Sequence, residues 1–253
     1  MSNSIIVSFK DIVHQVKLSC QFPDVLESIL SRQIIKQAIE KSDVEVTPEE
    51  IQAAADEMRL VMGLQSAELT WSWLETHHLD LENFEEIAYN SLITQKLAHK
   101  VFGNEVEPFF TQHQLDYAEA VFYEVILEDS DLAMELFYAL KEGEISFPEV
   151  AAQYIRDTEQ RRKGGYRGRL GRTALKPEIS AAVFSASPNQ VIKPILTSQG
   201  AHLILVEELI TPVLDDNLRQ EILESLFSEW LSSEVKKLEV KIEEKELRVS
   251  NNG

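Results

Sequence analysis

RDTEQRRKGGYRGRLGRTALK, residues 156–176, is the most distinctive stretch of this chain. It holds eight of the 24 lysines and arginines in a protein of formal net charge −19, together with four of the nine glycines. Glycines at this density let the backbone adopt positive φ and approach other groups closely. We therefore expect a loop that shapes a binding site, since binding residues are concentrated on loops held by a rigid scaffold. The alternative is a solvated loop whose positive charge balances nearby acidic groups.

Composition narrows the class of protein. With 253 residues, 44% hydrophobic and 26% charged, the chain has the composition of a soluble globular protein. No apolar run approaches the roughly 18 residues of a membrane span, so no membrane insertion is expected. The first residues lack a basic segment followed by a long apolar one, and the lone Cys20 fits a reducing compartment, which together predict a cytoplasmic protein. The acidic surface argues against nucleic acid as a partner.

The sequence before the basic stretch is helical in pattern. Thr47-Pro48-Glu49-Glu50 combines a capping threonine, a proline suited to the first turn and a glutamate that completes a capping box. The helix that starts there should end near Gly63, and another should run from Leu81 to Phe102. His77 and His78 are adjacent, so on a helix their side chains diverge and cannot easily share a metal ion. We expect neither a metal nor a cofactor.

Strand signals surround the basic stretch. Residues 118–127, AEAVFYEVIL, are β-branched and aromatic and predict a strand, followed by two helices. After the predicted loop come a short helix over 177–184 and strands over 191–197 and 201–206, which makes a compact α+β unit. Beyond Pro212 the pattern predicts a helix to about Arg248, whose first half carries an apolar stripe that must pack against another element.

Four motifs in order resemble the parvulin-type peptidyl-prolyl isomerases: FYEVIL at 122–127, LKEGEISFPEVAAQYIRDT at 140–158, the GG-x-x-G at 164–168, and LKPEISAAVFSASPNQVIKPILTSQGAHLI at 175–204. The flanking helical regions resemble SurA-like and PrsA-like chaperones, in which the last helix returns to the N-terminal domain. The resemblance implies an α+β protein with an all-helical N-terminal domain over 1–114 and a parvulin-like domain over 115–211. The C-terminal segment 212–253 would form a long helix that packs back and completes the helical domain.

The resemblance also implies a site. His202, in Gly-Ala-His-Leu-Ile, matches the family's second histidine, and Thr197 matches the threonine before that strand. The family's Asp or Cys position falls on Asp157 or Thr158, and loop length favours Thr158. The apolar residues that would grip the proline ring are Leu175, Ile179 and Phe184.

One departure bears on activity. Glu124 stands where the family has its first histidine, and a carboxylate facing His202 favours the charged imidazole and changes the field in the pocket. We therefore expect a weakened isomerase acting on proline-containing unfolded or nascent polypeptides. The alternative is a catalytically degraded domain that only binds peptides. Arg167 and Arg169 would attract acidic residues that flank a substrate proline.

Overall fold

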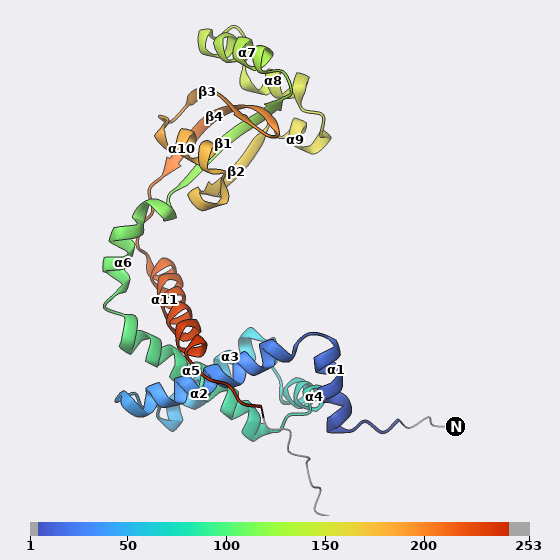
Figure 1. Ribbon diagram of the computed structural model, residues 1–253, viewed down its shortest axis with the longest axis vertical. Helices are drawn as coiled ribbons and strands as arrows, with labels where there is room; N and C mark the ends of the chain where they lie inside the picture. The colour runs from blue at the N-terminus through green and yellow to red at the C-terminus, as the bar shows by residue number, and fades with distance from the viewer. Residues whose placement is uncertain (1–4, 243–253) are drawn as a thin grey trace, which may run out of the picture. The chain divides into compact units, whose positions relative to one another are not determined.

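The computed structural model describes residues 5–242, which form two compact units (Figure 1). The helical unit comprises residues 5–106 together with 219–242, and the sheet unit comprises residues 107–218. Both boundaries differ from those expected at 114/115 and 211/212. The structure groups α6 (Val106–His113) and the first turn of the last helix with the sheet.

The helical unit is built around α5, a 22-residue helix spanning Leu81–Phe102. Its other elements are α1 (Phe9–Leu18), α2 (Phe22–Lys41), α3 (Pro48–Val61), α4 (Ala67–His77) and most of α11 (Asp216–Lys236). The core packs Leu74 of α4 against Phe84 and Ala88 of α5. α11 joins this unit through Phe227 and Trp230, whose rings lie 6.3 and 6.2 Å from that of Phe102. The C-terminal helix therefore completes the helical domain, as the fold class predicted.

The local sequence explains where these helices begin. Thr47 Oγ1 accepts from the backbone N–H of Glu50, and Glu50 Oε2 accepts from the N–H of Thr47, so the expected capping box is present. The same glutamate receives the ammonium of Lys96 at 2.6 Å, which ties the start of α3 to α5. Helix α1 was not anticipated from the sequence. α11 ends at Lys236 instead of continuing, and residues 243–248 of the predicted helix lie outside the described residues.

The sheet unit contains a four-stranded antiparallel sheet in the order β2-β1-β4-β3. Its elements in chain order are α6, the 3₁₀ helix η1 (Gln114–Tyr117), β1 (Glu119–Leu127), α7 (Ser130–Glu142), α8 (Phe147–Tyr154), α9 (Thr158–Arg162), β2 (Tyr166–Gly171), η2 (Arg172–Ala174), α10 (Pro177–Ser185), β3 (Gln190–Thr197) and β4 (Gly200–Ile210). Together with the helical unit, this confirms the predicted α+β class.

Each face of the sheet is covered by different helices (Figure 1). Val125 and Leu203 pack with residues of α7 and α8 on one face. Phe122, Ile204 and Val206 pack with Ile179 and Val183 of α10 on the other, here called the α10 face. Because side chains alternate along a strand, the even-numbered residues of β1 and the even-numbered residues 202–206 of β4 point to the α10 face.

The basic stretch is not the loop that its composition predicted. It contains α9 and the edge strand β2, which pairs with β1 from Glu119↔Gly171 to Tyr123↔Tyr166. The glycines make this possible: Gly164 and Gly165 adopt φ of +64° and +81° and turn the chain from α9 into the strand. Gly165 also accepts a 2.8 Å hydrogen bond from the N–H of Glu124, at a spacing where a Cβ would collide with the Glu124 carbonyl.

Candidate functional site

A chain of polar side chains lies on the α10 face of the sheet. His202 Nδ1 lies 2.7 Å from Glu124 Oε1, and His202 Nε2 lies 2.7 Å from Thr197 Oγ1. Glu124 Oε2 in turn lies 3.2 Å from Arg167 Nε. The structure therefore brings together four of the residues singled out from the sequence, contributed by β1, β2, β3 and β4. We call these four residues the polar network.

The contacts of His202 are compatible with one assignment of donors and acceptors. A carboxylate can only accept, so Nδ1 of His202 carries a proton and donates to Glu124. Thr197 Oγ1 accepts from the N–H of Gln199 at 3.0 Å and can donate its own proton to Nε2. A neutral imidazole protonated at Nδ1 can form both hydrogen bonds of His202. Arg167 also places a guanidinium beside Glu124, a contact that sequence reasoning did not identify.

The members of the polar network differ in how far their side chains are exposed to solvent. The side chain of Glu124 is only 8% exposed, whereas that of Arg167 is 44% exposed. His202 is 1% exposed, so its ring is enclosed by the protein and acts on its surroundings through Glu124 and Thr197. Arg167 and Thr197 are the members that reach the surface.

A β-bulge aims Arg167 at this network. The pairing of β1 with β2 shifts between Phe122↔Gly168 and Tyr123↔Tyr166, which leaves Arg167 as the extra residue. Bulges commonly redirect a side chain in this way. Gly168, with φ of +77°, supplies the conformation that the bulge requires.

The apolar residues predicted for the proline pocket lie on the same face. Ile179 is buried in the cluster with Phe122 and Ile204, and Leu175 and Phe184 pack against that cluster while remaining partly exposed. The guanidinium of Arg172 lies 5.2 Å from the centre of the Phe184 ring, a cation–π contact that sequence reasoning missed. At the rim, Lys176 Nζ donates to Gln199 Oε1 at 2.9 Å and links the approach to α10 with the β3–β4 turn.

Two predicted site residues lie elsewhere. Arg169 pairs with Val121 in the ladder, so it points to the face opposite the polar network, where it forms an ion pair with Glu119. Thr158 is exposed as the first residue of α9, and among the described residues no hydrogen bond joins it to the polar network. Its neighbour Asp157 caps α9 by accepting from the N–H of Gln160 at 2.8 Å. Arg169 and Thr158 therefore do not belong to the site as the structure draws it.

The opposite face carries a separate titratable group. Burial raises the pKa of the Tyr123 phenol, and the nearby carboxylate of Glu207 acts in the same direction. Its ring lies 5.3 Å from that of Tyr166. This tyrosine is part of the packing under α7 and α8 and plays no part in the polar network.

Two further searches of the described residues bear on the class of site. Within residues 5–242 no group of three His, Cys, Asp or Glu side chains is placed to hold a metal ion. None of the helices in that range combines the length and the apolar content that crossing a bilayer requires.

Comparison with known proteins identifies the sheet unit. Residues 127–208 match the Rotamase family of PPIC-type PPIase domains. The foldase PrsA of Halalkalibacterium halodurans is 25% identical over 211 residues, which cover 78% of this chain and 62% of that protein. The chaperone SurA of Shewanella sp. is 31% identical over 86 residues, or 33% of this chain and 20% of that protein.

A solved structure extends the likeness in fold to most of the chain. The crystal structure of PrsA from Bacillus cereus aligns over 94% of this chain and 91% of that one, with a TM-score of 0.51 and 17% identity. The chain spans less than two thirds of the length of the first three curated PrsA relatives. Residues 127–208 thus match a rotamase domain of the PPIC type, in a chain similar to the PrsA and SurA chaperones.

Proposed function

We propose that this chain is a peptidyl-prolyl cis-trans isomerase that acts on X–Pro bonds of unfolded or nascent polypeptides. The observation that carries the proposal is that the polar network and the partly exposed Leu175 and Phe184 share the α10 face. This arrangement supports isomerisation, a reaction that breaks no covalent bond. The reaction needs an apolar pocket for the proline ring and polar groups that stabilise the twisted amide.

The twisted amide sets the requirement. Rotation about a peptide bond has an uncatalysed barrier of about 18–20 kcal/mol because conjugation is lost on the way. In that state the proline nitrogen becomes a hydrogen-bond acceptor and the carbonyl polarity changes. A site that fits this state better than either planar form lowers the barrier. Leu175 and Phe184 would hold the ring, with Ile179 supporting them from the core.

Arg167 is the member of the polar network best placed to meet a substrate. Its Nε bonds to Glu124, which leaves both Nη groups as donors on a side chain that is 44% exposed. His202 and Thr197 hold Glu124 and the β3–β4 turn in place, so they are positioning residues in this scheme. Preorganised donors in a partly enclosed site cost little reorganisation during the reaction.

The ion pair between Glu124 and Arg167 is a reason to expect slower proline isomerisation than in parvulins with two histidines. Their histidines and threonine form a neutral network, whereas here a carboxylate and a guanidinium occupy the floor. The substitution Glu124→His removes the buried carboxylate and restores a second histidine, while Arg167 keeps its donors. We expect this substitution to raise the rate above that of the wild type if charge is the cause.

Exchange spectroscopy on a short proline-containing peptide tests the proposal. Uncatalysed exchange takes tens to hundreds of seconds, so acceleration at a small molar fraction of protein is directly visible. We expect acceleration that grows in proportion to protein concentration. No acceleration at any concentration would reject the enzyme proposal.

One observation favours a second function, polypeptide binding without turnover. His202, Glu124 and Thr197 satisfy one another within the chain, as they would in an inactive domain. Suppression of aggregation of an unfolded client separates the two functions. Binding alone would require stoichiometric protein and would survive His202→Ala, whereas isomerisation would turn over and would not.

The client class and location are also proposals. The relatives named foldase and chaperone support polypeptide clients, and proline-containing unfolded chains are the class that fits the site. The cytoplasmic location expected from the sequence stays a prediction, which fractionation of the source cells would test.

A further inference from the structure

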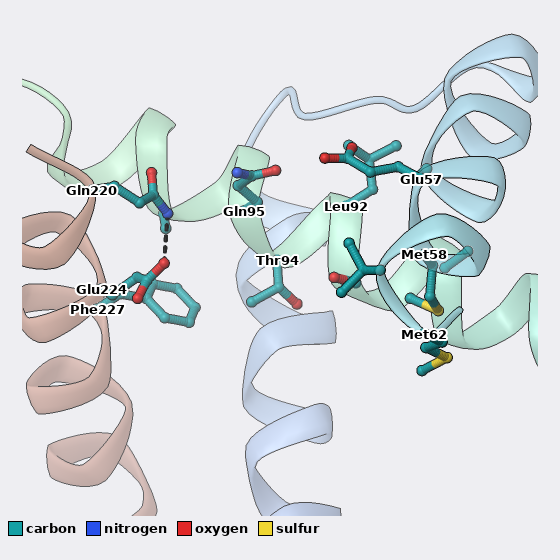
Figure 2. A pocket seen from close by; sticks show the side chains of 14 residues that line it. Glu57, Met58, Met62, Leu92, Thr94, Gln95, Gln220, Glu224 and Phe227 are labelled. Carbon is teal, nitrogen blue, oxygen red and sulfur yellow. Dashed lines mark hydrogen bonds between the residues drawn. The ribbon is translucent and has the colours of Figure 1, made fainter. Parts of the chain in front are cut away.

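The helical unit contains a cavity of about 540 Å³ between α3, α5 and α11 (Figure 2). Such a volume is within the range of ligand-binding pockets. The walls come from Met58 of α3, from Met62 directly after it, and from Glu224 and Phe227 of α11. Leu92 of α5 lies between them. Sequence reasoning did not identify this site, because its walls are far apart in the sequence.

The charged residues that line the cavity are all acidic. Glu57 of α3 and Glu224 of α11 lie on opposite walls, and the lining contains no lysine, arginine or histidine (Figure 2). Glu224 Oε1 accepts from Gln220 Nε2 at 2.7 Å, and neither carboxylate forms an ion pair within the described residues. Both are exposed, so a cation entering the cavity would find two unneutralised carboxylates beside apolar side chains.

The dimensions favour a stretch of polypeptide over a small cation. On α3 the lining runs from Ala54 to Met62, which is about 12 Å along the helix axis at 1.5 Å per residue. An extended chain covers that distance in about four residues. Methionine side chains such as Met58 and Met62 adapt to differently shaped apolar partners, which suits a site that accepts many sequences.

We infer that this cavity binds a short apolar client segment that carries a lysine or arginine. The inference rests on the proposed function, because it names the part of a polypeptide client that the helical unit would hold. Apolar side chains of the segment would contact Met58, Leu92 and Phe227. Its cation would lie between Glu57 and Glu224. Segments rich in aspartate or glutamate would be rejected by the same carboxylates.

Peptide binding to the full chain tests this inference. The probe is a short fluorescent peptide of leucine and lysine that lacks proline, and its partner has glutamate in place of lysine. We expect fluorescence anisotropy to show binding of the lysine peptide that weakens with salt, and no binding of the glutamate peptide. The double variant Glu57→Lys, Glu224→Lys should weaken binding at least tenfold.

A matched control removes the effect of net charge. Glu221 is exposed on α11 and does not line the cavity. The double variant Glu49→Lys, Glu221→Lys changes the protein charge by the same amount at two exposed sites outside the lining. We expect it to bind the lysine peptide within about threefold of the wild type at moderate salt, where long-range attraction is screened.

Three results would overturn the inference. One is a wild-type protein that does not bind the lysine peptide. Another is equal weakening by the cavity and control variants. The third is a wild-type dimer that the cavity variant dissociates, since a second copy would then occupy the cavity. The isomerase rate on a short peptide is measured in parallel, and we expect it to be unchanged in both variants. A protein that binds the lysine peptide but does not catalyse exchange would reject the enzyme proposal alone.

Discussion

The two units of this chain bury their apolar side chains to different degrees. In the sheet unit the central strands β1 and β4 are covered on both faces, and Phe122, Leu203 and Ile204 are almost fully enclosed. In the helical unit, α1 has no buried residue and Ile6, Phe9 and Trp71 are exposed. One unit fixes its polar side chains in a single arrangement, whereas the other leaves apolar surface and a cavity open.

This difference matches two kinds of task. Chemistry at one bond requires side chains held within small tolerances by their neighbours, as the polar network is held between four strands. Capture of many sequences requires apolar surface that is not already covered. The two proposals together assign a preorganised site to the sheet unit and an adaptable one to the helical unit, and the following substitutions test that assignment.

The largest expected effect comes from removing one buried leucine in each unit. Leu203 is 0% exposed in the sheet unit and Leu74 is 1% exposed in the helical unit. Truncation of either to alanine should lower the free energy of unfolding by about 2–5 kcal/mol. All three tryptophans, at positions 71, 73 and 230, lie in the helical unit, so their fluorescence reports its unfolding specifically.

Leu196→Ala is the control, because Leu196 is 67% exposed. We expect it to change stability by less than about 0.5 kcal/mol in urea titrations followed by circular dichroism. A cost for Leu203→Ala no larger than that of the control would contradict the tightly packed sheet.

The next effect concerns the glycine that holds Glu124. Gly165 has φ of +81°, and a Cβ there would lie 2.7 Å from the Glu124 carbonyl oxygen. Gly165→Ala should therefore destabilise the protein by about 1–3 kcal/mol and displace Glu124. Gly171 has φ of −71° and open space around its Cα, so Gly171→Ala should be neutral or slightly stabilising. Equal thermal midpoints for the two variants would refute this reading of the turn.

Two arginines on one strand offer a sharper contrast. Arg167 neutralises the largely buried Glu124, whereas Arg169 pairs with the more exposed Glu119. Arg167→Ala should cost about 1–2 kcal/mol, a figure that allows for the partial exposure of Arg167. Arg169→Ala should cost about 0–1 kcal/mol.

Adding Glu124→Gln to Arg167→Ala should recover part of the loss, because the buried carboxylate that lost its cation is then gone. Urea titrations of the single and double variants measure this coupling. The absence of any recovery would show that Arg167 does not act through Glu124.

The smallest effect is in the helical unit and depends on pH. The ammonium of Lys96, then the backbone N–H of Thr47, hold the pKa of Glu50 below its ordinary value of 4.5. A carboxyl group whose pKa is lower in the folded state stabilises the protein above its unfolded pKa, and that stabilisation is lost as pH falls through the folded pKa. Glu50→Gln should therefore be less stable than the wild type at neutral pH, with the gap closing in acid. A gap that persists unchanged to the lowest pH would contradict the assignment.

Much of the sheet unit could be predicted because its motifs are local and ordered. Strand β1 and the helices after it follow from local signals in the sequence, and the resemblance to parvulins implied that His202 lies near Glu124 and Thr197. Strand β2 could not be predicted, since YRGRLG lacks an apolar alternation and its pairing with β1 depends on distant residues. The sequence alone did not separate Arg167 from Arg169, because a bulge between distant strands decides which arginine faces Glu124.

In the helical unit the sequence predicted the bounds of some helices, but not what the helices enclose. The capping box at Thr47 and the helix from Leu81 to Phe102 were predicted correctly from local signals. The cavity is formed by residues of α3, α5 and α11, and no local pattern announces such a convergence. The end of α11 at Lys236 was missed because the charged sequence after it has good helix formers.

The central claim is that residues of the α10 face catalyse proline isomerisation, and its most direct test compares three variants of the sheet unit with the wild type. Exchange rates of a proline-containing peptide are measured at equal concentrations of wild type, Leu175→Ala, His202→Ala and the exposed-site control Leu196→Ala. We predict that Leu175→Ala and His202→Ala each lower the catalysed rate about tenfold or more. The loss of a contact that stabilises the twisted state by roughly 1.4 kcal/mol has that effect. The control should match the wild type. Unchanged rates for Leu175→Ala and His202→Ala in folded protein would contradict the assignment of catalysis to the α10 face.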